Sequence, residues 1–430
     1  MSGICCSCAQ SYGQDTVRLT LNDAIELALR GNTDLIVAQK QEIVAERYKQ
    51  EINGGFLPKV TISGDYTRNI DKQVIYLPEG SGMGGGPTQI GSDNTFNTSL
   101  DLNIPLYSRT SFANMAYANV NLNLQRETLR GTRQTVITNV KKSYFNYVVG
   151  IATVEVRKKG VNNARQNLQN TEEKLSKGVA TEFDKASASV KLTTAKNNLL
   201  EAETNLIPLA NKLKILLGIL TAAVISPADS LTVSQEELLS GPVLGDLLSN
   251  NSTEKQMRLK TTLAEQQSKI TSSAYFPTVV AVGNYQIQSQ NNNLKFSEYD
   301  WVRTNYLGLK LSFPIFNGTI TKRKLQQAVL SEEIALKQQQ LAIENNRAQY
   351  EQITSQLGYS KQRISLHEEN IHLSENAFEL AKERYKYGKG TFLEMSNAEY
   401  DYTTAWLNYL QAVLDYKSAY FDYELLIGKN

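Results

Sequence analysis

Four segments of the chain alternate apolar and polar residues with a period of two, which is typical of β-strands that have one apolar and one polar face. In the first segment, for example, Val60, Ile62 and Tyr66 alternate with polar residues. A strand of roughly 10 to 13 residues crosses a bilayer when it is tilted. We therefore predict membrane strands at about 58–76, 95–107, 277–290 and 301–316.

Two long stretches, 106–207 and 315–430, contain none of the nine prolines. Both are rich in residues that a helix interior tolerates well, such as Ala, Leu, Gln, Lys and Glu. We predict one nearly continuous helix from Arg109 to Lys177 and a second from Gly318 to Tyr387. About 70 helical residues span roughly 100 Å, which is longer than a single globular core.

Shorter helices with a seven-residue spacing follow the predicted turns at Gly178 and Gly388. A period of about 3.5 residues keeps one side of a helix facing a partner, and small residues allow close approach. We therefore predict antiparallel helical hairpins at about 109–218 and 318–428. The aromatic residues could instead form a ligand-stacking surface, but aromatic residues at this spacing more often pack in the seam. The repeated positions of the second half are Ala398, Ala405, Ala412 and Ala419 with Tyr402, Tyr409, Tyr416 and Tyr423.

The two halves of the chain are tandem copies of one pattern. FLPKV at 56–60 is echoed by YFPTV at 275–279, LDLNIPLY at 100–107 by LKLSFPIF at 309–316, and GxxT at 178–181 by GxxT at 388–391. The first β-hairpin is ten residues longer than the second (58 to 105 against 277 to 314), and the surplus is the glycine-rich segment Pro78–Pro87, which we interpret as a surface loop. The expected divisions are an N-terminal segment that could be a signal remnant (1–18), the first structural repeat (19–218), a linker (219–242) and the second structural repeat (243–430).

These elements predict a mainly α-helical protomer with a membrane β-barrel portion, in which a helix, a β-hairpin and a long helical hairpin occur twice. In lipid, a four-stranded sheet would leave backbone groups unpaired at both edges unless several chains share one closed barrel. The longest apolar run, Ile215–Ile225, is too short for a transmembrane helix. We therefore expect the barrel to close only when chains assemble.

Composition and charge point away from catalysis and from nucleic acid. The 45 Lys and Arg residues nearly balance the 43 Asp and Glu residues, and no basic cluster stands out. Cys5, Cys6 and Cys8 are the only cysteines, so the rest of the chain can form no disulfide and no thiolate metal site. His367 and His372 are spaced so that their imidazoles point about 140° apart on a helix, which prevents them from sharing a zinc ion. We predict no enzymatic activity, no cofactor and no metal site.

In this order, the duplicated motifs resemble those of the TolC-like outer-membrane efflux proteins, from about Leu19 to Gly428. LTLNDAIELALRGN at 19–32 is similar to the N-terminal helix of that family, and Leu57-Pro58 and Phe276-Pro277 resemble its helix-to-strand entries. The resemblance implies a homotrimer in the outer membrane of a Gram-negative bacterium, with a twelve-stranded barrel and a periplasmic α-helical tunnel. It also implies an outer-membrane channel of a tripartite efflux or type I secretion system. The implied partners are a periplasmic adaptor protein, an inner-membrane pump and outer-membrane lipid.

The resemblance further implies roles for individual residues. Glu394 and Asn397 align with the narrow periplasmic gate, where relatives commonly carry two acidic side chains, so we expect one acidic ring rather than two. Asp184 occupies the matching place in the first repeat and is expected to contribute less to the pore. In an alternative interpretation, Glu394 is an exposed carboxylate near a helix N-terminus. The expected adaptor-contacting tips are Gly178, Thr181, Gly388 and Thr391, and the expected helix–strand junctions are Pro58, Pro105, Pro277 and Pro314.

A second function stays open at the level of sequence. A soluble or surface coiled-coil scaffold or adhesin without channel activity would account for the seven-residue spacing. It would not account for the duplicated strands bounded by proline. The residues do not indicate which substrate would be exported.

Overall fold

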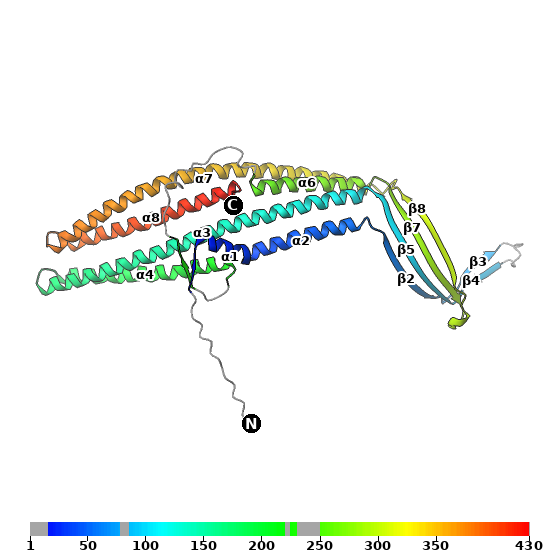
Figure 1. Ribbon diagram of the computed structural model, residues 1–430, viewed down its shortest axis with the longest axis horizontal. Helices are drawn as coiled ribbons and strands as arrows, with labels where there is room; N and C mark the ends of the chain where they lie inside the picture. The colour runs from blue at the N-terminus through cyan, green and yellow to red at the C-terminus, as the bar shows by residue number, and fades with distance from the viewer. Residues whose placement is uncertain (1–15, 78–85, 220–223, 230–249, 430) are drawn as a thin grey trace, which may run out of the picture. The chain divides into compact units, whose positions relative to one another are not determined.

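The computed structural model describes residues 16–77, 86–219, 224–229 and 250–429 (Figure 1). The three cysteines and most of the glycine-rich segment lie outside the described residues. The chain forms two compact units, each with segments from both halves. The helical unit comprises Met1–Glu42, Gln125–Met257 and Gln338–Asn430, and the sheet unit comprises Ile43–Leu124 and Arg258–Lys337. The boundaries of the two repeats stay a prediction.

The sheet unit contains a four-stranded antiparallel sheet with the strand order β2-β5-β7-β8. Its central strands, β5 and β7, come from different halves of the chain, and β2 and β8 are its edges. The strands are β2 (Lys59–Arg68), β5 (Asn94–Ser108), β7 (Thr278–Asn291) and β8 (Val302–Ser312). Thus both predicted hairpins exist, and the pairing of β5 with β7 joins them into one sheet.

The register of the sheet gathers apolar residues on one face. Directly opposed residues of antiparallel strands point to the same face. One such row is Ile62, Leu100 and Tyr285, which ends at Asn305 on the edge strand β8. The neighbouring row, which contains Ser63 and Ser99, lies on the opposite face and is polar. The apolar face is open in the single chain, since 74% of Ile62 is exposed. The predicted alternation is therefore confirmed, and its apolar side has no cover within the described part of the sheet unit.

The first strand is shorter than predicted because the chain leaves the ladder at Asn69. The backbone N–H of Asn69 donates to the carbonyl of Asp93, and its side-chain amide donates to the carbonyl of Ser92, both at 2.8 Å. The rest of the predicted strand forms β3 (Gln73–Leu77), which pairs with β4 (Gly86–Ile90) in a separate two-stranded sheet.

Three of the four expected junction prolines lie between elements. Pro58 precedes β2, Pro277 precedes β7 and Pro314 follows β8. The prediction for Pro105 is wrong, because this residue lies inside β5. Proline has no N–H to donate to a ladder and is tolerated at irregularities, and the pairing of β5 with β7 shifts register between Pro105 and Tyr107.

The helices agree closely with the proline-free stretches. The predicted long helices correspond to α3 (Arg109–Ser176) and α7 (Ile320–Lys386). The other described elements are β1 (Thr16–Leu19), α1 (Leu21–Gly31), α2 (Thr33–Gly54), α4 (Glu182–Leu217), β6 (Val224–Pro227), α6 (Ser252–Ser273), the short 3-10 helix η2 (Phe296–Glu298) and α8 (Phe392–Leu426). None of the described helices combines the length and apolar character needed to span a membrane.

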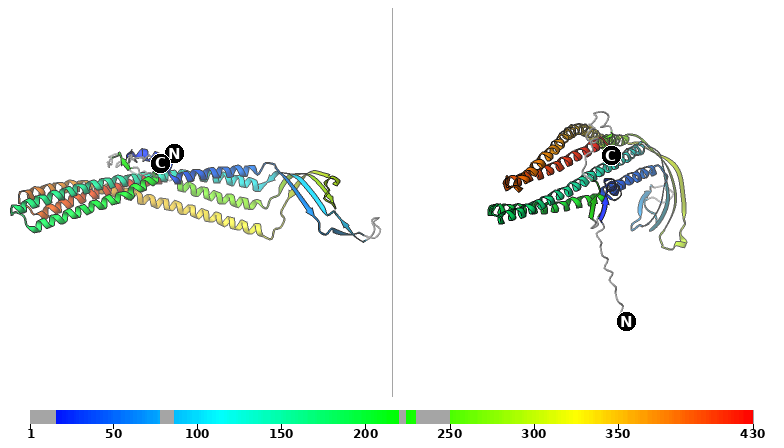
Figure 2. Two further views of the ribbon diagram at one scale, coloured as in Figure 1. Left: turned by 90° about the horizontal axis from the view of Figure 1, so that it is seen from below. Right: turned by 60° about the vertical axis from the view of Figure 1, so that its left-hand side comes forward.

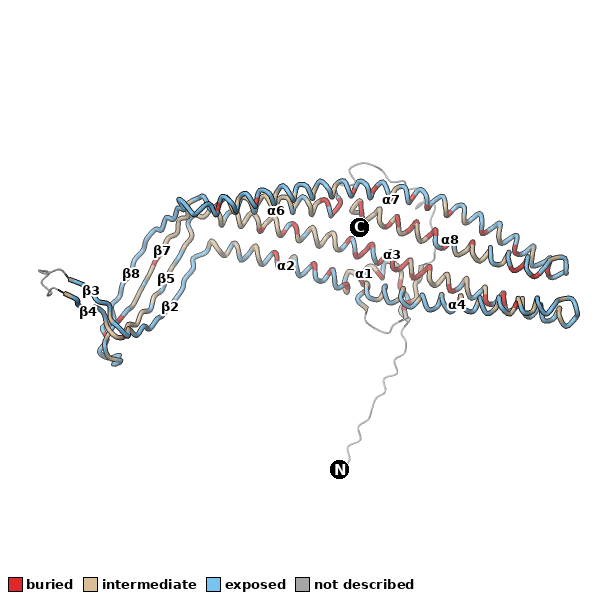
Figure 3. The backbone as a smooth tube through the Cα atoms, turned by 180° about the vertical axis from the view of Figure 1, so that it is seen from behind, coloured by how far each residue is buried: buried red, intermediate tan, exposed pale blue. Residues whose placement is uncertain are grey.

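Within the helical unit, α3 and α4 form one hairpin and α7 and α8 form a second (Figures 1 and 2). The tyrosines of α8 lie in the seam of their hairpin, as predicted. The hydroxyl of Tyr402 is 3.0 Å from the carboxylate of Glu375, and the hydroxyl of Tyr409 is 3.2 Å from that of Glu368. These two bonds are seven residues apart on both helices, so they repeat with the period of the seam. Figure 3 shows the buried residues of α8 in red along this hairpin.

A core joins α1, α3 and α4 with the short parallel pair β1 and β6. Tyr144 is fully buried there, and its hydroxyl lies 2.9 Å from the carbonyl of Leu19 and 2.8 Å from the carboxylate of Asp229. Burial, together with the adjacent carboxylate, raises the pKa of Tyr144 to about 12. The phenol therefore stays neutral and ties the segment after β6 to the helices.

Candidate functional site

The two hairpin tips have the same backbone structure. Gly178 and Gly388 both adopt the left-handed conformation, with φ of +72° and +71°. In the first tip the N–H of Val179 donates to the carbonyl of Lys174 at 2.9 Å, and the equivalent bond in the second tip measures 2.8 Å. Residues with a side chain rarely adopt this conformation, so glycine is needed where each long helix ends.

Each tip also begins its returning helix with a reciprocal cap. The carboxylate of Asp184 accepts from the backbone N–H of Thr181 at 2.9 Å, and that of Glu394 accepts from the backbone N–H of Thr391 at 3.1 Å. In return, both threonine hydroxyls accept from the backbone N–H three residues later. The bonds from Thr181 lower the pKa of Asp184, so this cap persists at neutral pH and weakens only as the pH falls through that lowered pKa. The structure thus confirms that Glu394 stabilises a helix N-terminus.

Capping leaves Glu394 available for contact with solvent. Glu394 and Asn397 are both exposed and lie about one helical turn apart on α8. Asp184 is half-buried and lies on α4, in the other hairpin. Further exposed polar residues follow Glu394 along the same helix, at Asn397, Asp401, Asn408 and Gln411. Glu394 and Asn397 are therefore the members nearest the tip of a polar face of α8.

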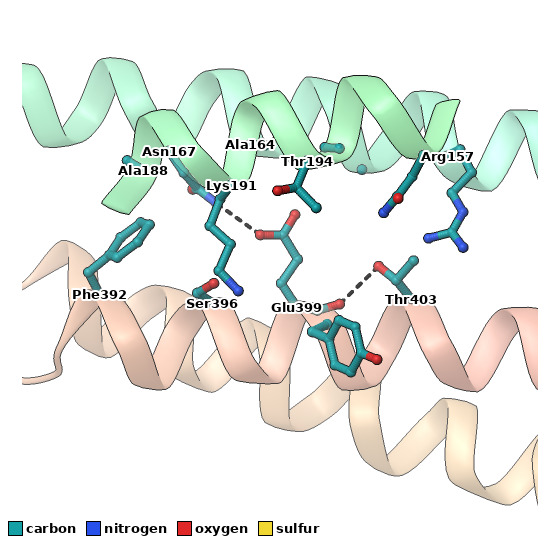
Figure 4. Close-up of a pocket in the computed structure, with 14 residues that line it drawn as sticks. Arg157, Ala164, Asn167, Ala188, Lys191, Thr194, Phe392, Ser396, Glu399 and Thr403 are labelled. Carbon is teal, nitrogen blue, oxygen red and sulfur yellow. Dashed lines mark hydrogen bonds between the residues drawn. The ribbon is translucent and has the colours of Figure 1, made fainter. Parts of the chain in front are cut away.

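A site that the sequence analysis missed lies between the two hairpins, in a pocket of about 200 Å³ lined by α3, α4 and α8 (Figure 4). Glu399 of α8 points into it, and its carboxylate accepts a hydrogen bond of 3.0 Å from the side-chain amide of Asn167 on α3. Arg157 of α3 and Lys191 of α4 also line the pocket. The pocket thus surrounds one carboxylate with polar and cationic side chains from the other hairpin.

Burial raises the pKa of Glu399. The nearby groups that lower it, which are Asn163, Lys191, Lys382 and Asn167, do not fully offset the loss of water around the carboxylate. The folded protein therefore holds the proton of Glu399 more tightly than the unfolded chain does. Its contribution to stability is fully present below the pKa of the unfolded chain and is lost as the pH rises through the raised pKa.

Glu399→Gln is expected to increase thermal stability at pH 7 to 8 and to leave it unchanged near pH 4. The amide keeps the shape and the hydrogen bond to Asn167 but removes the charge of a half-buried side chain. We expect the apparent melting temperature to rise by a few degrees at the higher pH. Thermal unfolding followed by circular dichroism across this pH range measures the effect.

Glu369→Gln is the matched control, because Glu369 is exposed on α7 and its neutralisation removes no buried charge. If Glu399→Gln lowers the melting temperature at pH 8 and leaves it unchanged at pH 4, the carboxylate contributes a stabilising ion pair instead.

A weak signal for Glu399 is present in the sequence. Five α8 residues line the pocket, and four of them have the alternating spacing of a packed helix face. These four are Phe392, Ser396, Glu399 and Thr403, and the fifth is Tyr400. Polar residues at such positions contact either solvent or a polar partner inside the protein. Only the placement of α3 and α4 against α8 distinguishes these outcomes.

The described residues contain no group of three or more His, Cys, Asp or Glu side chains that could hold a metal ion. The pocket around Glu399 combines one carboxylate with amides and cations, which suits hydrogen bonding between helices. The pocket residues therefore contribute to the contact between the two hairpins.

Comparisons with solved structures show a shared fold. The outer-membrane channel OprN matches with a TM-score of 0.82 and 18% identity, over 95% of this chain and 90% of that one. The CmeC outer membrane channel of Campylobacter jejuni matches with a TM-score of 0.76 and 19% identity, over 95% and 85%. The outer membrane protein VceC of Vibrio cholerae matches with a TM-score of 0.76 and 16% identity, over 95% and 96%.

Comparison of the sequence with curated proteins gave no match. In contrast, the family model for outer membrane efflux protein matches residues 24–219 and 243–429, which include both hairpins and both pairs of strands. A coiled-coil scaffold without channel activity is therefore not favoured. Because the match extends over most of both halves, the chain belongs to the outer membrane efflux protein family and is a channel protein of the outer membrane.

Proposed function

We propose that three copies of this chain assemble into a passive exit duct of a tripartite export system, in which twelve strands close one barrel and the long helices form a periplasmic tunnel. The observation that carries this proposal is the open sheet. Every residue of the edge strands β2 and β8 is exposed in the single chain.

Closure between chains would satisfy two requirements at once. Unpaired backbone groups cannot face lipid, so the β2 edge of one chain needs a partner such as the β8 edge of the next. The apolar face of the sheet would then contact lipid and the polar face would contact water. No chemical step is needed for this role, and the substrate would pass without modification.

The tips provide surfaces for the other components. Members of the family work with a periplasmic adaptor and an inner-membrane pump. In this chain a Cβ atom added at Gly178 or at Gly388 would meet no atom within 4 Å, so the space beside each turn is open to a partner. We propose that the adaptor contacts these glycines together with Thr181 and Thr391.

Glu394 is the proposed gate residue. Three-fold symmetry would bring three copies of its carboxylate around one axis, and a ring of carboxylates attracts cations and resists anions. Two carboxylates about 6 Å apart repel by roughly 0.7 kcal/mol even in water. Asn397 adds no charge, so Glu394 would dominate this level of the pore.

Glu394→Lys is expected to lower the cation selectivity of single channels strongly. Purified trimers are inserted into planar bilayers under a salt gradient, and the reversal potential reports the selectivity. Lysine places a cation where the proposed ring has an anion, so the reversal potential should move toward anion preference.

Asp184→Lys is the matched control, because Asp184 caps its helix in the same way but lies on α4. We expect it to change selectivity less. Equal changes in both variants would indicate a general effect of tip charge, and unaltered conductance and selectivity in Glu394→Lys would exclude this residue from the gate. If wild-type protein forms no channels, the duct itself is contradicted.

A further inference from the structure

α7 carries two apolar stripes, and only one of them is covered. Tyr350, Leu357, Ile364, Ile371, Phe378 and Tyr385 recur every seven residues and are all buried. Two residues after these positions, a second stripe recurs with the same period and is 59–68% exposed. It consists of Tyr359, Leu366, Leu373 and Leu380, and Tyr387 continues its spacing directly after the end of α7. Two residues correspond to about 200° around a helix, so the stripes lie on nearly opposite sides.

α4 has the same two-sided character. Its buried side contains Ala188 and Leu213 and packs within the chain. On the other side, the large apolar residues Phe183, Val190, Leu200 and Ile207 are 61–78% exposed. Small or polar residues lie between these apolar ones on the same side of the helix. Successive members of the stripe are alternately three and four residues apart. The full stripe is Phe183, Ala186, Val190, Thr193, Asn197, Leu200, Thr204 and Ile207.

The exposed stripes match each other when counted from the tips. α4 runs away from its tip glycine and α7 runs toward its own, so the two helices can pair antiparallel. At equal distances from Gly178 and Gly388, Leu200 lies level with Leu366. The same count pairs three further positions, namely Ala186 with Leu380, Thr193 with Leu373 and Ile207 with Tyr359. A large side chain thus meets a small one near the tips, and two large ones meet farther away.

We infer that the exposed stripe of α4 packs against the exposed stripe of α7 from a second copy of this chain, in the register that sets Leu200 against Leu366. A helix that is apolar on two sides is typical of one that packs between two neighbours. The two stripes are different surfaces, so their contact is head-to-tail and can close into a ring of identical chains. The inference rests on the proposed trimer and specifies which helical surfaces hold it together.

Charge at the edge of the stripes fits the same register. Glu182 lies level with Arg384, and both are exposed. The guanidinium of Arg384 has a hydrogen bond of 3.3 Å to the carbonyl of Lys389, which leaves other N–H groups free to face a carboxylate. This pair would flank the apolar contact on its tip side.

Disulfide cross-linking tests the register. Cys5, Cys6 and Cys8 are first replaced by serine, which leaves a chain without cysteine. Leu200→Cys and Leu366→Cys are then introduced together, and the assembled protein is oxidised in detergent. A disulfide requires Cα atoms about 4.4–6.8 Å apart. We expect covalent dimers and trimers on a denaturing, non-reducing gel, and their loss on reduction.

Two controls separate this contact from accidental linkage. Each single variant should give no covalent trimer. Leu200→Cys with Leu380→Cys moves one partner by 14 residues, or about 21 Å along the helix, and should also remain unlinked. If the first pair disturbs assembly, Thr193→Cys with Leu373→Cys tests the same register and keeps Leu200 and Leu366.

The native mass of each variant, measured before oxidation, distinguishes the possible failures. If the protein is trimeric but neither matched pair forms a covalent link, the inference is overturned and the proposed trimer is not. The exposed stripes would then be free to contact an adaptor helix. Trimers that link best in the shifted pair would overturn the register. A monomer of the cysteine-free parent would contradict the proposed trimer itself.

Discussion

Gly218→Ala is expected to destabilise the helical unit by about 3 kcal/mol or more, the largest effect of any alanine substitution proposed for this chain. Gly218 follows α4 with φ of +70°, and a Cβ atom there would lie 2.2 Å from the carbonyl oxygen of Gly31. The neighbouring atoms are backbone, so they cannot rotate away as a side chain could. We expect a large fall in the apparent melting temperature, which circular dichroism measures.

Gly178→Ala provides the matched control. Gly178 has nearly the same backbone angle, with φ of +72°, but no atom lies within 4 Å of an added Cβ. Its substitution carries only the conformational cost of about 1–2 kcal/mol. The difference between the two variants therefore measures the close approach of Gly218 to Gly31. Equal losses of stability in the two variants would show that the backbone conformation alone accounts for the effect of each substitution.

The second large effect is expected for Asn251→Ala, at about 2–3 kcal/mol. Asn251 is buried, and its side-chain oxygen accepts from the backbone N–H of Glu254 at 3.0 Å, which caps α6. Its side-chain amide donates to the carbonyl of Leu426 at 2.8 Å, near the end of α8. Alanine would remove both bonds, and also the bond of 3.2 Å that Asn251 accepts from the side-chain amide of Asn346. Two helix ends would then lack these partners.

Asn251→Asp separates the two roles, because aspartate still caps α6 but cannot donate to Leu426. We expect a loss smaller than that of alanine. Asn376→Ala, at an exposed position of α7, should be nearly neutral in the same thermal unfolding experiment. We call the contact of Asn251 with the start of α6 and the end of α8 a joint. If Asn251→Ala lowers the melting temperature no more than Asn376→Ala does, the joint does not hold the helix ends.

The ends of the long helices could be predicted from sequence because local residues determine them. α3 and α7 extend through stretches without proline, and Gly178 and Gly388 supply the conformation that ends a helix. The caps by Thr181 and Thr391 follow from the same local pattern. Each of these features depends on residues within a few positions of one another.

Features that depend on packing could not be predicted in this way. The burial of Glu399 is a property of α3, α4 and α8 together. The exit of the chain from its ladder at Asn69 depends on bonds to Ser92 and Asp93, beyond the glycine-rich segment. Pro105 lies inside β5 and not at the expected helix–strand junction, because the register shift between β5 and β7 accommodates a proline there. In each case the deciding partner lies far away in sequence.

The joint at Asn251 has a copy in the first half of the chain. Asn32 accepts from the N–H groups of Asp34 and Leu35, and its amide donates to the carbonyl of Leu216. Each half thus carries its own means of fixing the end of its returning helix, α4 or α8, to the start of the helix that precedes its β-hairpin, α2 or α6, with a close glycine contact beside it. Each attachment therefore uses residues of its own half alone. The first β-hairpin is ten residues longer than the second, and both halves have the same attachment.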